Sequence, residues 1–200
     1  METALNTKGR IFNNSFLESL TKTSFNITFT FYPLIVCTLI ALHIWYSDLA
    51  LVGSILLYAI GFFYWTLFEY LMHRYLFHFI SEKKWIQKFH YTIHGIHHDY
   101  PRDEERLFMP PVPGFLIASI LFGVLYILLG NMAFLFEGGM LSGYLIYVYV
   151  HYMVHAKRPI RGLRFLWTHH AKHHYSHPEK AFGVSSPLWD YVFNTMPPKK

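Results

Sequence analysis

Four long apolar runs set the strongest limit on what this chain can fold into. They cover residues 26–46, 50–68, 114–130 and 138–154, and each is near the length of about 20 residues that a helix needs to cross a bilayer. Only 14% of the residues are charged, against about 25% in an average soluble domain. Because a soluble protein built on four buried helices would have little polar surface left, we expect an all-α integral membrane protein with four transmembrane helices.

The basic residues indicate the orientation of these spans. All 17 Lys and Arg lie in three segments, which are residues 1–24, 69–112 and 156–200. Neither of the two short links, 47–49 and 131–137, contains one. Because the cytoplasmic segments of membrane proteins carry the excess of Lys and Arg, we expect a multi-pass protein with both termini in the cytoplasm.

The same segments suggest the domain organisation. Residues 1–24 lack the pattern of a cleavable signal peptide and are expected to form a cytoplasmic N-terminal segment. Residues 25–200 then form one membrane domain, in which residues 69–112 and 156–200 build a cytoplasmic cap of histidine-bearing helices. The formal charge of +5 fits anionic lipid headgroups. Since apolar runs separate the basic residues, we expect no nucleic-acid partner.

Histidines are concentrated in the expected cap. The pattern His-x2-His-His occurs twice, and each copy follows a shorter pair that starts at the cytoplasmic end of a span. Since positions i, i+3 and i+4 share one face of a helix, the three side chains of each copy project together. The ten clustered residues are His73, His78, His94, His97, His98, His151, His155, His170, His173 and His174.

Ten imidazoles aimed at one volume predict a metal centre. Neutral imidazole binds Zn, Fe, Cu and Ni, and since one ion takes about four to six ligands, ten histidines suit two ions. Without metal, so many rings would leave polar atoms unpaired and would repel one another when protonated. His73 and His78 are five residues apart and diverge on an α-helix. They therefore either serve different metals or are brought together by a kink.

Other polar residues lie close to these clusters in the sequence. Glu69 is one helical turn before His73 and is predicted to orient that ring. His43 lies inside the first apolar run and is interpreted as a structural residue. Candidates for a further ligand, or for a hydrogen bond to a ligand, are His90, His169, His177, Asp99, Asp103 and Asp190.

The chemistry of such a centre has two main alternatives. Zinc has no redox chemistry but activates water for hydrolysis, whereas iron can use O₂ to attack a C–H bond. A site at the ends of the spans lets a lipid headgroup stay outside while its chain reaches the metals, and an inert methylene needs an oxidant. We therefore favour lipid oxidation. The zinc alternative is a membrane hydrolase of amide or ester lipids with Glu69 as its base. A metal transporter would need polar ligands along the spans, where only His43 lies well inside a run.

These motifs resemble the fatty acid hydroxylase/sterol desaturase superfamily, and its fatty acid 2-hydroxylase branch in particular. The resemblance extends over residues 60–195 and includes the pair Pro110-Pro111. The matching motifs are His73-Arg-Tyr-Leu-Phe-His78, His94-Gly-Ile-His97-His98 with Pro101-x-Asp103-x2-Arg106-Leu, His151-x3-His155, and His170-x2-His173-His174.

This resemblance implies a four-span fold with a cytosolic histidine cap and a di-metal centre. The ten clustered histidines would be the ligands, iron the active metal, O₂ the oxidant and an acyl chain the substrate. It also implies that zinc can occupy the site of a purified protein. It adds Asp103 and Arg106 to the candidate site residues, because their motif recurs in the family.

The expected activity is hydroxylation of a fatty acyl or ceramide (sphingolipid) chain, with C2 as the expected position. Oxidation of a sterol, carotenoid or alkyl lipid is the alternative within the same chemistry. The 2-hydroxylase branch tends to show Tyr-Asp-x2-His at the fourth span, whereas this chain has Tyr147-Val148-x2-His151. Tyr147 is therefore a candidate substrate contact, and the missing Asp leaves the exact substrate open.

The electron donor is expected to be a separate protein. Many eukaryotic relatives carry a fused cytochrome b5 domain, for which the 200 residues of this chain leave no room. A separate cytochrome b5, a ferredoxin or a reductase would then supply the electrons. The expected membrane is a bacterial inner membrane or the endoplasmic reticulum.

Overall fold

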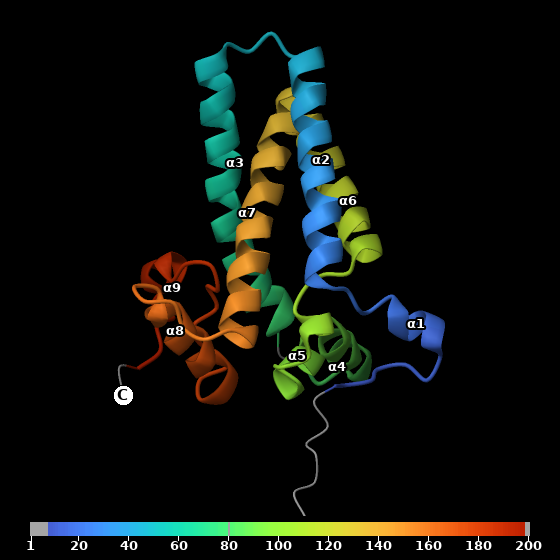
Figure 1. Cartoon of the computed structure of the whole chain (residues 1–200), viewed down its shortest axis with the longest axis vertical. Helices are drawn as coiled ribbons and strands as arrows, with labels where there is room; N and C mark the ends of the chain where they lie inside the picture. The colour runs from blue at the N-terminus through green and yellow to red at the C-terminus, as the bar shows by residue number, and fades with distance from the viewer. Residues whose placement is uncertain (1–7, 80, 199–200) are drawn as a thin grey trace, which may run out of the picture.

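The computed structural model describes residues 8–79 and 81–198, and the regular secondary structure in these residues is entirely helical. Four helices are long and apolar enough to cross a membrane. They are α2 (Phe25–Tyr46), α3 (Leu51–Leu71), α6 (Pro111–Leu129) and α7 (Met132–Ala156). Figure 1 shows them as an elongated bundle in which α7 contacts each of the other three. The expected four-span, all-α membrane fold is confirmed.

The fourth span begins earlier than the sequence suggests. A start at residue 138 after a link over 131–137 is wrong, because α7 is helical from Met132. The chain turns instead at Gly130, whose φ is 56°. The Gly138-Gly139 pair, which suggests a break in the helix, lies within α7. A Cβ atom at position 139 would be 2.2 Å from the carbonyl oxygen of Tyr58. The absence of a side chain at Gly139 therefore allows α3 and α7 to pack closely.

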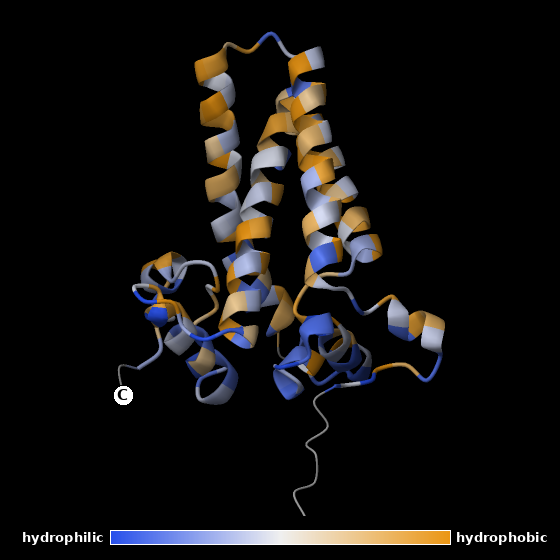
Figure 2. Cartoon of the chain, viewed as in Figure 1, coloured by the Kyte–Doolittle hydropathy of each residue, from blue (hydrophilic) through white to orange (hydrophobic). Residues whose placement is uncertain are grey.

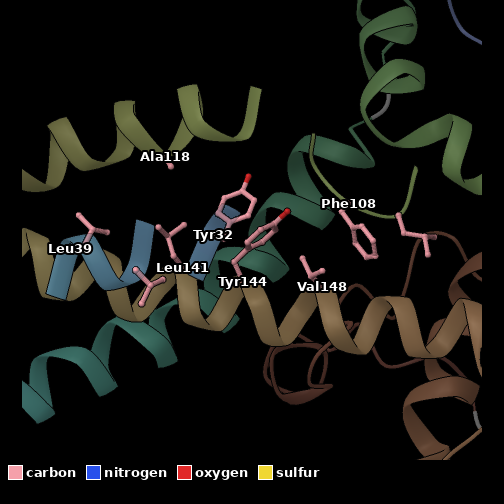
Figure 3. Packing of buried hydrophobic residues seen from close by; sticks show 9 residues of the cluster. Tyr32, Leu39, Phe108, Ala118, Leu141, Tyr144 and Val148 are labelled. Atoms are coloured by element: carbon pink, nitrogen blue, oxygen red, sulfur yellow. The ribbon is translucent and has the colours of Figure 1, made fainter. Parts of the chain in front are cut away.

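The core of the bundle is formed by α7 and the helices around it. About 56% of the apolar stretch of α7 is buried, against 6% of the corresponding stretches of α3 and α6, so the outer faces of α3 and α6 are left for lipid. Figure 3 shows the rings of Tyr32 and Tyr144 side by side. Their ring centroids are 4.8 Å apart in an edge-to-face arrangement, a geometry that aromatic pairs prefer.

Shorter helices form a cap at one end of the bundle (Figure 1), and hydrophilic residues gather at the same end (Figure 2). The helix α1 (Ser15–Ser19) lies beside this cap. The described part of the chain begins and ends here, far from the α2–α3 connection. The cap elements are η1 (Met72–Phe77), α4 (Lys84–His90), η2 (Tyr91–Gly95), α5 (Ile96–Asp99), η3 (Glu104–Arg106), α8 (Arg164–Tyr175) and α9 (Leu188–Val192).

Candidate metal centre

The ten clustered histidines divide into two groups of five where the spans meet the cap. Site 1 contains His73, His78, His94, His98 and His173, and site 2 contains His97, His151, His155, His170 and His174. Within each site, one ring nitrogen from every residue lies within 4.8 Å of the others. An ion holds imidazole nitrogen at about 2.1 Å, so opposite ligands of one ion are about 4.2 Å apart. Each group therefore needs only small shifts to surround one ion.

Each copy of the His-x2-His-His pattern contributes to both sites. In the first copy His94 and His98, one helical turn apart, belong to site 1, while His97 belongs to site 2. The copy in α8 is arranged the other way round, because its i, i+4 pair belongs to site 2 and His173 belongs to site 1. The three histidines of each copy share one helix face, as the spacing predicts, but that face contributes to both sites and not to one alone.

A π-helix brings His73 and His78 into the same site. The two residues would diverge on an α-helix, but η1 (Met72–Phe77) has the wider i to i+5 turn. Residues five apart then lie nearly above one another, and the two ring centroids are 5.1 Å apart. Of the two alternatives left open by the spacing, a local change in helix geometry is the one found.

Backbone carbonyls orient three of the ten rings. Because a carbonyl oxygen can only accept a hydrogen bond, Nδ1 of each of these rings carries the proton and Nε2 carries the lone pair. Metal-ligating histidines usually have their other ring nitrogen held in this way. The three bonds run from Nδ1 of His73 to Phe182 (2.5 Å), from Nδ1 of His173 to Lys180 (2.7 Å) and from Nδ1 of His151 to Leu107 (2.9 Å).

The buried ring nitrogens suit a metal ion better than they suit one another. Nε2 of His78 and Nε2 of His173 are buried without a hydrogen-bond partner. In site 2, Nε2 of His170 faces Nε2 of both His155 and His174, at 2.7 and 3.1 Å. A neutral imidazole has only one N–H to donate. An ion at the middle of each group would bind these lone pairs, so the residues present fit two metal ions.

Burial keeps these rings in the neutral form that binds metal. Burial, together with repulsion from the nearby rings of His173 and His98, lowers the pKa of His78 to about 3. Burial likewise lowers the pKa of His98 and the pKa of His173 to about 4 each. The pKa of His97 is held well below its usual 6.5 by burial and by repulsion from neighbouring rings. Near pH 7 these rings would not need to lose a proton before binding an ion.

Glu69 acts on site 1 through a loop. It does not bond to His73 as its position predicts, and that direct contact is a correction to the sequence interpretation. The Glu69 carboxylate accepts hydrogen bonds from the backbone N–H groups of Val184 (2.7 Å) and Ser185 (2.9 Å). Phe182, whose carbonyl binds His73, lies in the same loop. The glutamate therefore holds the segment that orients the ring.

Asp190 and His169 hold this loop from the other side. Asp190 is completely buried and accepts hydrogen bonds from the N–H groups of Phe182 (2.9 Å) and Gly183 (2.7 Å) and from Nε2 of His169 (3.0 Å). Burial alone would raise the pKa of Asp190, but these bonds and one from Thr195 lower it overall. His169 is thus a hydrogen-bond partner beside the centre and belongs to neither ligand group.

Asp103 and Arg106 support the loop that carries Leu107. Both side chains are buried. Arg106 donates to the carbonyl oxygen of Gly9 at 3.0 Å, pairs with Glu18, and lies 3.4 Å from the Asp103 carboxylate. These contacts join the N-terminal segment to the cap. They lie next to Leu107, whose carbonyl orients the His151 ring of site 2.

The remaining candidates lie outside both ligand groups. His90 and His177 are half-buried, and Asp99 is exposed at the end of α5. Tyr147 stacks on His151 with 5.4 Å between the ring centroids. Tyr147 therefore borders site 2.

An open cleft of about 470 Å³ reaches site 2 from the surface of the cap. One of its walls is His155, a member of the ligand group. The exposed side chains of Arg102, Lys157 and Arg158 line the same cleft and outnumber its one acidic residue, Glu104. The cleft is therefore positively charged and suits an anionic group or an acidic partner.

Sequence reasoning missed the groups that orient the histidine rings. The carbonyls of Leu107, Lys180 and Phe182 belong to the backbone, which carries no residue-type signal. The partnership of Glu18 with Arg106 was also missed, because 88 residues separate them. A buried arginine needs an acidic partner, but nothing in the sequence says which carboxylate it is.

Known proteins resemble this chain over most of its length. A family model described as fatty acid hydroxylase matches residues 58–195. A fatty acid 2-hydroxylase of Macaca fascicularis is 41% identical over 150 residues, which are 72% of this chain and 40% of that protein. The dihydroceramide fatty acyl 2-hydroxylase FAH2 of Arabidopsis thaliana is 34% identical over 190 residues, which are 94% of this chain and 80% of that protein.

A solved structure shares the fold. It is described as full-length scs7p with only the hydroxylase domain visible, and it superposes with a TM-score of 0.84 at 33% sequence identity. The match covers 94% of this chain and 71% of the other. The chain spans only 40% of the length of the fatty acid 2-hydroxylases that it matches.

Proposed function

This chain belongs to the fatty acid hydroxylase family, and on that premise we propose that it is a membrane monooxygenase that hydroxylates a lipid acyl chain. The observation that carries the proposal is the pair of five-histidine groups between the spans and the cap. Site 1 and site 2 would each hold one ion, which we propose to be iron, although zinc can occupy such a site in a purified protein. When bound, iron would supply the redox chemistry by which O₂ hydroxylates a C–H bond, with two electrons and two protons converting the second oxygen atom to water.

The substrate we propose is a fatty acid or a ceramide, hydroxylated at C2. The names of the relatives refer to 2-hydroxylation of fatty acids and of dihydroceramide acyl chains. The position of the centre supports this carbon. C2 is next to the C1 carbonyl of the acyl group and lies near the membrane surface, as the two histidine groups would at the ends of α3 and α7. A carbon in the middle of the chain would lie deeper between the spans.

The engagement of Glu69 favours oxidation over hydrolysis. A zinc hydrolase needs a free carboxylate base near the metal-bound water. Glu69, the candidate for that role, is buried and accepts hydrogen bonds from two backbone N–H groups and from the Ser185 hydroxyl. Its oxygens are therefore occupied by hydrogen bonds to the loop beside site 1, and it is not a free base.

We propose a separate electron-transfer protein, such as a cytochrome b5, a ferredoxin or a reductase, that approaches the cap from the cytoplasm. Both termini then lie on the cytoplasmic side, in line with the distribution of Lys and Arg. The reported relatives come from an animal and a plant, which favours the endoplasmic reticulum over a bacterial inner membrane.

The test is lipid mass spectrometry on cells that express the chain together with a reductase system, under ¹⁶O₂ and ¹⁸O₂. The expected product is a fatty acid or ceramide with one labelled oxygen at C2. His97→Ala and His173→Ala, one from each site, should abolish the product and lower bound metal. His43→Ala is the control, because His43 lies in α2, outside both ligand groups, and bonds to Ser54 at 3.1 Å.

Other outcomes separate the alternatives. A labelled oxygen on a sterol, carotenoid or alkyl lipid would keep the chemistry and change the substrate. A cleaved lipid without label would point to zinc-dependent hydrolysis. Full activity and full metal content in both cluster variants would contradict the assignment of the ten histidines.

A further inference from the structure

The groups that orient the ligands differ between the two sites. Site 1 has two rings held by carbonyls, and both carbonyls belong to one loop, residues 180–185. Site 2 has one ring held in this way, by Leu107. These two loops are far apart in the sequence, and each is supported by its own set of buried polar residues.

The loop at site 1 is held on both sides. Ala181 lies between the two carbonyls with a φ of 57°, in the left-handed region, and its N–H donates to the carbonyl oxygen of Thr195 at 2.9 Å. Asp190 and Glu69 then bind four consecutive backbone N–H groups, from residue 182 to residue 185. Two buried carboxylates thus hold nearly every peptide of this loop.

The segment that carries the Leu107 carbonyl at site 2 is held by a different set of residues. Arg106 precedes Leu107 and is nearly completely buried. Its guanidinium binds the Gly9 carbonyl and the Thr21 hydroxyl at 3.0 Å each and pairs with Glu18. The support of this loop therefore comes from the N-terminal segment, which lies before the first span.

The two supports are not joined by polar contacts. Within residues 8–79 and 81–198, no hydrogen bond or ion pair connects Asp190, Glu69 or the 180–185 loop to Arg106 or the N-terminal segment. The sites are linked through α5 and α8, which contribute ligands to both. Unfolding of either helix would empty both sites, whereas loosening one loop acts on one site.

We propose that the two metal sites are positioned by separate scaffolds, so that each can lose its metal while the other keeps it. Asp190 and Glu69 are positioning residues for site 1, and Arg106 is the positioning residue for site 2. This rests on the proposed two-metal centre but not on the reaction, because it concerns metal affinity alone. Loss of a group that orients a ligand typically weakens metal binding by about 10- to 100-fold.

The test is titration of the metal-free full-length protein in detergent with Zn²⁺ and, for its visible absorption, with Co²⁺. Wild type should bind two ions. Asp190→Asn should bind one ion normally and the other 10- to 100-fold more weakly, and Arg106→Gln should do the same. Glu137→Gln is the matched control, because Glu137 is an equally buried carboxylate in α7 that belongs to neither scaffold, and it should leave both affinities unchanged.

Double variants identify which site is affected. His78→Ala weakens site 1 directly and His155→Ala weakens site 2 directly. Asp190→Asn should add little to His78→Ala but should remove the remaining strong site from His155→Ala. Arg106→Gln should show the opposite pairing. This pattern cannot arise from a general loss of stability, which would weaken the remaining site in both backgrounds.

Several results would overturn the proposal. Equal weakening of both sites by Asp190→Asn and by Glu69→Gln would show one shared scaffold, and unchanged affinities in both variants would show that the loop does not position its rings. Both variants are needed because Asp190 also bonds to His169 of α8, which carries residues of both sites. If Asp190→Asn yields no folded protein, Glu69→Gln takes its place, since it loosens the same loop from α3 and carries the same expectation. A wild-type protein that binds no metal would refute the proposed centre itself, whereas absence of hydroxylation would leave this test valid.

Discussion

The contact between α3 and α7 allows a quantitative test of the packing that positions both sites. A Cβ atom added at Gly139 would lie 2.2 Å from the carbonyl oxygen of Tyr58 and 2.8 Å from the backbone nitrogen of Phe62. Both are backbone atoms of α3 and cannot rotate away. Since ordinary contact begins at 3.4 Å, Gly139→Ala forces the two helices apart by about 1 Å.

This separation should be measurable as lost stability. Overpacking in a well-packed core costs about 1–3 kcal/mol, and a clash with backbone belongs at the upper end of that range. For a chain of this size about 1 kcal/mol shifts the melting temperature by about 2–4 °C. We therefore expect Gly139→Ala to melt roughly 4–12 °C below wild type. Thermal unfolding in detergent, followed by circular dichroism, measures the shift.

The neighbouring glycine is the control for this experiment. A Cβ at Gly138 would meet only side-chain atoms, of Leu39 and Tyr58, at 3.8 Å. Gly138→Ala should therefore leave stability unchanged, or raise it by up to about 1 kcal/mol because alanine suits a helix better than glycine. Equal melting temperatures for the two variants would refute the close approach of α3 and α7 at position 139.

Three further predictions concern the cap. In the folded protein the pKa of His78 is about 3 and that of His98 about 4, so the metal affinity of the folded apoprotein should stay nearly constant from pH 8 to about 5. Isothermal titration calorimetry measures this affinity, and a decline already below pH 7 would contradict neutral ligands. The same rings titrate at about 6.5 when unfolded, so the stability of the metal-free protein should be complete above that pH and fall as the pH drops toward 4, because only the unfolded chain takes up protons there; denaturant unfolding at several pH values tests the sign. Glu18→Ala leaves Asp103 as the one remaining acidic partner of the buried Arg106 guanidinium in the described residues and should cost about 2–4 kcal/mol. Glu104→Ala, at an exposed carboxylate of the same region, should change stability by no more than about 0.5 kcal/mol.

The span prediction succeeded where its physical signal was local. Apolar length alone marks a membrane helix, because every buried backbone group must be satisfied within the segment. Three spans therefore begin and end near their expected residues. The start of α7 was misplaced because a Gly-Gly pair suggests a break and equally suits a tight helix contact. Only the presence of α3 against positions 139 and 143 distinguishes the two.

The sequence by itself determined that ten imidazoles gather at one end of the membrane spans, since ligand type and helical spacing are properties of short segments. Their division between the sites was decided only by tertiary structure. His73 joins His78 through the π-turn of η1. His173 belongs to site 1, whereas His170 and His174, the i, i+4 pair on the same helix, belong to site 2. The carbonyls that orient the rings come from loops whose partners lie 44 to 109 residues away, apart from Lys180. Backbone groups look alike in every sequence, so only the path of the folded chain selects which of them face a ligand.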